Sequence, residues 1–500
     1  MTYRLATSFI ALSTVLAAPA MAEVSAADVF ENQQALYSSF GATLSGDLSD
    51  GTLTNPGISV TLPQGIANFQ IATDAVSMTD NSDGTVTIEY PSPMTISVAA
   101  EAQNEGSFAA TATITHDGYT ITASGNPGDI SYEYNAQNLQ FSIENLSVDG
   151  ADVDTMEIDG VMTMTGYSGR SNITEGNLIA YTADAQIGAT DADFTFTSDN
   201  IIATSTQTTL PMATSIQASL PVGGSDIMNL SAALRDGLSI VATSSGEGSS
   251  STTVTMLGAE QMNRQETTTG PQDFEMTFDE NGIAMSGEGA DFSMLINDSL
   301  IFPADLEFGI GGVTMNYDVP INASDAQQDF RVATGLTDIT LGDTIWNMID
   351  PSGQLPRDPA EISFDVTGLG TNGMDLLDIA ALMGLMAPPP VEIDEVTIEN
   401  LRIAAVGAEA TATGSATFDW TDLQTIPGIA RPEGKVTVNL NGANALMDRL
   451  VAMGLIPEED LMMPRLMMGM FATPVGDDML ESVLEINKEG QVLANGQRLR

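Results

Sequence analysis

The chain has 500 residues, with 67 acidic against 14 basic side chains, one histidine and no cysteine. Without cysteine the chain has no disulfides, thiolate nucleophiles, iron–sulfur clusters or sulfur-bound zinc. A single histidine, His116, excludes metal sites built on two or three imidazoles. The formal net charge of −53 repels phosphate backbones, so no nucleic-acid partner is expected. With 43% hydrophobic and only 16% charged residues, the chain can still build a core beneath a solvated acidic coat.

The first 22 residues have the pattern of a secretory signal peptide. Arg4 supplies a positive charge, residues 5–18 form an uncharged apolar run, and Ala20-Met21-Ala22 has the small-x-small pattern of a cleavage site. We expect cleavage after Ala22 and a periplasmic mature protein, with an extracellular location as the alternative. The apolar run is shorter than the roughly 20 residues that cross a bilayer, so we expect no transmembrane segment in the mature protein.

A short helix and then a long series of strands are predicted for the mature chain. Ser25 to Asp28 has the pattern of a capping box, and Gly41 is a typical helix end. From about residue 48, apolar and polar residues alternate with a period of 2, as they do in 86–90, 130–134, 139–144, 194–196, 274–278, 362–366 and 436–440. Short Gly, Asn, Asp and Ser segments separate these runs, and Asn281-Gly282 is a typical hairpin turn. The sequence therefore predicts a mainly β protein, an elongated and curved antiparallel meander.

A few helices are expected, most of them in the C-terminal half. The apolar segment 375–386 ends before Pro388, and 443–455 and 458–471 have helical patterns. We place an N-terminal β-rich lobe at 23–330 and a C-terminal β lobe with apolar helices at 331–500, with one continuous domain as the alternative. Trp346 and Trp420 are expected in the core, because large aromatic side chains bury well.

The predicted helix 458–471 is rich in methionine. Thioethers are soft ligands that suit copper(I), but methionine also fills irregular apolar surfaces, and no histidine or cysteine lies nearby. We favour the apolar role. The candidate apolar-ligand surface consists of Met462, Met463, Met467, Met468 and Met470.

Catalytic and metal-binding motifs are mostly missing from the sequence. It contains no Gly-x-Ser-x-Gly elbow, Ser-x-x-Lys motif or Walker loop, and His116 is interpreted as a turn residue. We predict no catalytic, cofactor-binding or metal-ligating residue. The acidic segments 80–84 and 191–193 lack EF-hand spacing and are interpreted as solvated turns, although calcium remains an alternative ligand.

Several segments together resemble a known family. They are the region of Trp346 with Pro356 to Pro359, the strand and helix of GKVTVNLNGANALMDRL, and the closing hairpin that contains Asn495-Gly496. In this order the chain resembles the alphaproteobacterial family of exported proteins called domain of unknown function 2125, over essentially its whole length. That family implies no activity and no functional residues. The ending and the GAEATATGSATFD hairpin are also similar to AsmA-like envelope proteins, which implies a curved sheet with an apolar groove associated with lipid transport.

Three functions follow as hypotheses. The first is a non-catalytic exported protein that binds an apolar or lipid component of the cell envelope in a sheet groove. The second is an acidic extracellular or surface structural protein that binds calcium. The third is a carboxylate-dependent hydrolase, because the many acids allow paired carboxylates that no spacing singles out. The oligomeric state does not follow from the sequence.

Overall fold

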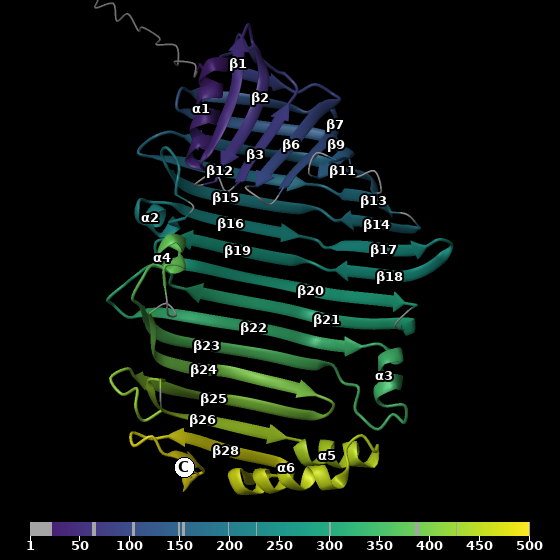
Figure 1. Cartoon of the computed structure of the whole chain (residues 1–500), viewed down its shortest axis with the longest axis vertical. Coiled ribbons are helices and arrows are strands. Elements are labelled where there is room, and N and C mark those ends of the chain that lie inside the picture. Colours follow the sequence, from purple (N-terminus) through teal and green to yellow (C-terminus); the bar gives the residue numbers. More distant parts are fainter. Residues whose placement is uncertain are drawn as a thin grey trace, which may run out of the picture.

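The computed structural model describes residues 23–62, 67–102, 106–148, 151–152, 156–198, 200–226, 228–299, 302–385, 390–426 and 428–499. The predicted signal peptide, residues 1–22, lies outside the described residues. The chain is mainly β, in one large antiparallel sheet, which confirms the predicted fold class. Figure 1 shows strand below strand along the long axis, with α1 at one end and α5 and α6 at the other.

Six helices lie within the described residues, four of them in the second half of the chain. They are α1 (Ala26–Ser39), α2 (Leu230–Arg235), α3 (Asp343–Ile349), α4 (Ile379–Met383), α5 (Ala443–Ala452) and α6 (Glu458–Phe471). Helix α1 begins at the predicted capping box, where the Ser25 hydroxyl accepts from the Asp28 N–H and the Asp28 carboxylate accepts from the Ser25 N–H. No described helix is long and apolar enough to span a membrane.

The N-terminal strands form two branches that meet at a long strand, β9. Strands β1, β2, β3, β6 and β7 pair in that order up to the second half of β9, whereas β4 pairs with β2 and leads through β5 and β8 to its first half. The bounds are β1 (Ala42–Ser49), β2 (Thr52–Thr61), β3 (Ala67–Thr73), β4 (Val76–Asp80), β5 (Val86–Glu89), β6 (Met94–Ala102), β7 (Gly106–Asp117), β8 (Thr120–Asn126), β9 (Asp129–Val148) and β10 (Ala151–Asp152).

Between the long strands β11 and β20, the sheet consists of two series of shorter antiparallel strands that lie side by side. We call each series a track. One track is β12, β15, β16 and β19, and the other is β13, β14, β17 and β18. The bounds are β11 (Met156–Thr174), β12 (Leu178–Ile187), β13 (Thr190–Ser198), β14 (Ile201–Thr209), β15 (Met212–Pro221), β16 (Ser239–Gly246), β17 (Ser249–Leu257), β18 (Glu260–Thr269), β19 (Gln272–Asp279) and β20 (Gly282–Asp298).

After β20 each strand pairs with the next, apart from the small strands at the end. The bounds are β21 (Phe302–Val319), β22 (Gln328–Leu341), β23 (Ala360–Asn372), β24 (Val391–Ala405), β25 (Ala408–Asp419), β26 (Arg431–Asn441), β27 (Thr473–Gly476), β28 (Met479–Ile486), β29 (Val492–Ala494) and β30 (Gln497–Arg498). Strand β28 pairs with β26, and it also pairs with the short strands β27 and β29. Strands β21, β22 and β23 pair continuously through the boundary expected near residue 330, and the two-lobe division stays a prediction.

The two tracks are joined along a line of bent strands that we call the crease. Gly188-Ala189, Leu210-Pro211, Glu247-Gly248 and Gly270-Pro271 each connect two strands that run in the same direction, such as β12 and β13. Backbone hydrogen bonds continue across the crease, including Gly188 N–H to Thr165 O at 2.9 Å. At Gly248, where φ is +124°, an added β-carbon would collide with the Thr269 carbonyl oxygen, so the bend requires glycine there.

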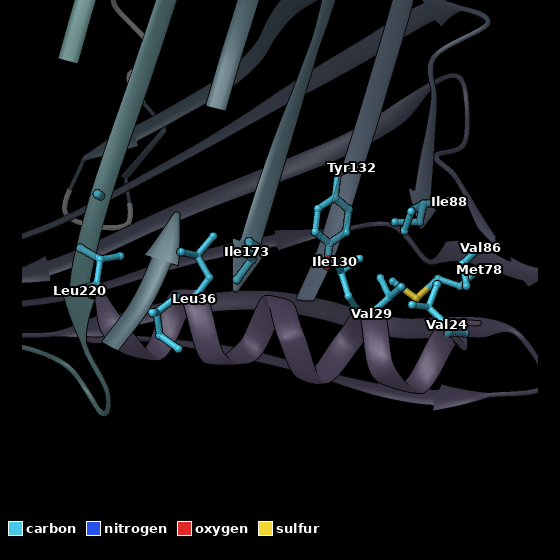
Figure 2. Close-up of a cluster of buried hydrophobic side chains, with 14 of the residues drawn as sticks. Val24, Val29, Leu36, Met78, Val86, Ile88, Ile130, Tyr132, Ile173 and Leu220 are labelled. Carbon is cyan, nitrogen blue, oxygen red and sulfur yellow. The ribbon is translucent and has the colours of Figure 1, made fainter. Parts of the chain in front are cut away.

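A sealed hydrophobic core exists at the α1 end of the sheet. Val29, Asn32 and Leu36 are buried on one face of α1, at the spacing of three to four residues that a helix needs to bury one side. Figure 2 shows α1 side chains pointing at residues of the strands, among them Ile130 and Ile173. The α2 residues Ala233 and Leu234, and Leu238 after that helix, belong to the same cluster. Every fully buried residue of this cluster lies between Val24 and Ile321.

Three expectations from the sequence are wrong. The acidic segment 191–193, interpreted as a solvated turn, lies within strand β13. The helix expected at 375–386 is only α4, and residues 386–389 lie outside the described residues. The Asp375 carboxylate instead accepts from Arg235 and from the Ala323 N–H. Leu376 and Leu377 pack against the core. Residues 375–377 are therefore an irregular segment, which we call the strap, and not part of a helix. Trp420 is 36% exposed, outside the core, and donates to the Ile393 carbonyl oxygen. Trp346 is buried, as expected, with the Arg357 guanidinium over its ring.

Candidate functional site: the apolar face of the sheet

The strand register places apolar side chains on one face of the sheet, which we call the apolar face. Residues that pair across antiparallel strands point to the same side, and alternate residues of a strand point to opposite sides. One row across β19 to β24 reads Phe274, Gly287, Met315, Thr334, Phe364 and Leu401. The next row on the same face reads Met276, Met285, Tyr317, Val332, Val366 and Ile398. The core under α1 is the covered end of this face.

Beyond the core, much of the apolar face is open to solvent. Ile362 is 46% exposed and Ile403 is 49% exposed, and they pair directly across β23 and β24. Other large apolar side chains exposed on this face are Phe69, Ile71, Phe108, Ile143, Phe194, Ile201, Ile216, Leu257, Phe274, Val319, Phe364 and Leu484. A continuous apolar surface of this kind typically marks a binding site, because isolated monomers rarely expose large apolar patches.

A hollow of about 530 Å³ lies on the apolar face where the crease crosses β18 to β21. Phe274, Phe292, Ile310, Val313 and Met315 give it an apolar lining. Gly270 and Pro271, which bend the chain between β18 and β19, form part of its wall. The bend thus coincides with an apolar concavity of the sheet.

The opposite face is polar and carries the strand-borne charges. A shallow groove of about 1470 Å³, which we call the gutter, crosses the polar face from β8 to β24. Acidic residues of the gutter include Glu133, Asp184, Asp273, Glu275, Glu288 and Asp365. Arg331 pairs with Asp365 at 2.8 Å. In the described parts of β11 to β26, every basic side chain that a strand carries lies on this polar face: Arg170, Arg264, Arg331, Arg402, Arg431 and Lys435.

Four aromatic rings form a cluster at the α1 end of the crease, which we call the tyrosine cluster. Tyr90 stacks on Tyr119 and Tyr134 stacks on Tyr167, both at 5.4 Å between ring centres, and Tyr119 lies 6.4 Å from Tyr167. Tyr167 directly follows Gly166, a positive-φ residue in the crease region of β11. Burial is the main cause that raises the phenol pKa of all four, to about 12 for Tyr134. The phenols therefore stay protonated, and the Tyr134 hydroxyl donates to the Asp184 carbonyl oxygen at 3.5 Å.

His116 supports this cluster. Its Nδ1 accepts from the Tyr119 N–H, and its Nε2 lies 3.2 Å from the Tyr90 carbonyl oxygen. Because Nδ1 accepts, the proton lies on Nε2, which donates to that carbonyl oxygen. Both ring nitrogens are thus used to position the backbone near the two tyrosines.

The pKa shifts found for carboxyl groups of the described residues all have the same direction. Every carboxyl group there with a shifted pKa is shifted downward, by hydrogen bonds from backbone or side-chain donors or by an arginine: Asp83, Asp350, Asp375, Asp419, Asp422 and Asp478. Within the same residues, no group of three or more His, Asp or Glu side chains is placed to hold a metal ion. The expected turn at 80–84 joins β4 to β5, and Asp80 accepts from the Ala26 N–H of α1.

The methionine surface lies on α6, away from the hollow. Figure 1 shows α6 beside α5, at the opposite end of the molecule from α1. Met462, Met463, Met467 and Met470 are exposed and Met468 is half-buried. Only Leu461 of this helix is buried. Whether this surface binds an apolar ligand stays a prediction.

Sequence reasoning did not find the hollow, the crease or the tyrosine cluster. Tyr134 and Tyr167 lie in strands β9 and β11, whereas Tyr90 follows β5 and Tyr119 precedes β8, and no spacing in the sequence joins the four. The crease does leave a signal, since Ile187 and Thr190 lie on the same face although they are three residues apart. No family model, curated protein or solved structure matches the chain.

Proposed function

We propose that this protein is an exported, non-catalytic protein of the periplasm that binds a lipid of the cell envelope along the apolar face. The observation that carries the proposal is the continuation of the apolar rows past α1 into strands whose apolar side chains are exposed among the described residues. An acyl chain that lies on these rows removes apolar surface from water on both partners. The weak resemblance to AsmA-like envelope proteins agrees with this function.

The distribution of charge supports the same proposal. The acids that the strands carry through the gutter face away from the apolar rows and keep the polar side hydrated. An apolar ligand therefore meets few groups that lose water on binding, and desolvation of a charged group is the main cost that would oppose binding.

Mass spectrometry tests the proposal on protein 23–500 purified from a periplasm without detergent. We expect stoichiometric lipid in the organic extract of the native protein. The double variant Phe364→Asp/Ile403→Asp places two charges on the apolar face, and it should lose the lipid while keeping its circular dichroism spectrum. Ser363→Asp is the matched control, because Ser363 is on the same strand but points to the polar face beside Arg402. A lipid-free native protein, or equal lipid in all three proteins, contradicts the proposal.

A further inference from the structure

We infer that the lipid binds with its polar head at the tyrosine cluster and its chain along the crease, and that it carries no net negative charge. This inference rests on the proposed function and adds the orientation and the class of the ligand. Three features carry it: the place of the cluster relative to the hollow, the chemistry of its side chains, and the position of the strand-borne cations of the described residues on the opposite face.

The tyrosine cluster and the hollow lie on the same face and on the same line. Tyr167 is in β11, and the hollow begins at Ser244 of β16 and Phe274 of β19. From β11 the path through β12, β15 and β16 to β19 crosses four strand spacings, or about 19 Å. An extended acyl chain of a phospholipid covers such a span. A ligand whose chain fills the hollow can therefore reach the cluster with its head.

The cluster has the amphipathic character that the head region of a lipid requires. Tyrosine presents an apolar ring with a polar tip, which suits a boundary between apolar and wet surroundings. The protonated hydroxyls donate hydrogen bonds to phosphate or ester oxygens. Aromatic rings also attract the ammonium group of a zwitterionic head. The stacked arrangement stabilises the fold as well, and this role alone would not discriminate between head groups.

The charge around the cluster selects against anionic lipids. The basic side chains of β11 to β26 all lie on the opposite face, so no strand-borne cation there faces the cluster. Arg170 is the strand-borne cation closest in sequence to Tyr167, and it points to the gutter and pairs with Asp184. The net charge of −53 adds a repulsive field for any anion. A zwitterionic lipid avoids this repulsion because its ammonium group balances its phosphate.

Lipid extraction from vesicles tests the inference directly. Protein 23–500, freed of bound lipid, is incubated with vesicles of dioleoyl phosphatidylcholine or of dioleoyl phosphatidylglycerol, whose chains are identical, and the bound lipid is quantified by mass spectrometry. We expect about tenfold more phosphatidylcholine, equivalent to 1.4 kcal/mol. Because screening by salt weakens repulsion, the ratio should fall at high ionic strength.

Two double variants test whether the tyrosine cluster causes the preference between the head groups. Tyr119→Phe/Tyr167→Phe keeps the stacked rings but removes two hydroxyls, and Tyr119→Leu/Tyr167→Leu also removes two rings. The phenylalanine variant should weaken binding of both phospholipids, because both carry the phosphate to which the hydroxyls donate. The leucine variant should also reduce the preference to less than about threefold, because it removes rings that attract the ammonium group. Binding of dioleoylglycerol, which has no charged head, should stay unchanged in both. The control is Ser168→Ala, since Ser168 directly follows Tyr167 in β11 but points to the polar face, where it lines the gutter.

The outcomes separate the two proposals. If native protein binds both phospholipids equally, or if the leucine variant keeps the full preference, the inference is overturned and lipid binding on the apolar face stands. If the native protein binds none of the three lipids, the proposed function itself is overturned.

Discussion

Replacing Asn32 by leucine should destabilise the protein, because Asn32 is a fully buried polar residue at the contact between α1 and the sheet. Its Oδ1 accepts from the Tyr132 hydroxyl at 2.8 Å, and its Nδ2 donates to Glu175 at 2.8 Å. Asn32→Leu is close in volume but removes both bonds. The Glu175 side chain is exposed and returns to water at little cost. The buried Tyr132 hydroxyl keeps its hydrogen bond with the Gln33 side chain but loses the acceptor of its own hydrogen, at a cost of about 1–3 kcal/mol.

A second substitution tests this explanation. Tyr132→Phe removes the hydroxyl that has lost its acceptor. The double variant Asn32→Leu/Tyr132→Phe should therefore be more stable than Asn32→Leu alone by about 1 kcal/mol or more. Stability is measured by urea unfolding followed by far-UV circular dichroism, with attention to a constant slope of the free energy of unfolding against urea. Ser38→Ala, on the exposed side of α1, is the control and should stay within about 0.5 kcal/mol of the native protein. A double variant less stable than Asn32→Leu would refute the reasoning.

Two further predictions concern the crease and a surface turn. Gly248→Ala should destabilise by about 2 kcal/mol or more, since φ is +124° and the methyl group meets the Thr269 carbonyl oxygen. Gly469→Ala, in an open part of α6, should stabilise by about 0.5–1 kcal/mol; urea midpoints test both, and equal effects would contradict the argument. The Thr425 N–H and hydroxyl lower the pKa of Asp422 from 3.8 to about 2. The stabilisation relative to Asp422→Asn should therefore be complete above pH 4 and disappear as the pH falls through 2; a pH-independent difference in midpoint excludes this.

Elements with local signals could be predicted from the sequence. Helix α6 has the predicted bounds, Glu458–Phe471, because acids in its first turn favour its start. Strand pairs such as Phe278 and Ile283 follow from period-2 alternation around an Asn-Gly turn. The strap at Asp375 was missed, since its structure depends on Arg235, which lies 140 residues away in the sequence.

Gly and Pro residues in the crease have another meaning than the usual rules suggest. Between alternating runs, Gly270-Pro271 indicates a turn that reverses the chain. In the structure it bends a strand that continues in the same direction, from β18 into β19. Strand pairing decides whether the chain reverses or continues at Gly270-Pro271. Here it continues, because β18 and β19 both pair with the single long strand β20. Alternation likewise predicts an apolar face for each strand but not whether anything covers it.

The confinement of the sealed core to one end predicts a gradient of local stability. Strands β9 and β11 are held by α1 as well as by their neighbours, whereas β24 to β26 are held mainly by strand pairing and by α5. In sheets extended mainly in one direction, local opening depends on the nearest neighbours. Hydrogen exchange followed by mass spectrometry should therefore find the slowest amides in β9 and β11 and faster exchange in β24 to β26. Lipid on the apolar face should slow exchange in β19 to β23 and, where its head lies, around Tyr134 of β9. Equal protection along the sheet would mean that α1 adds little to its stability.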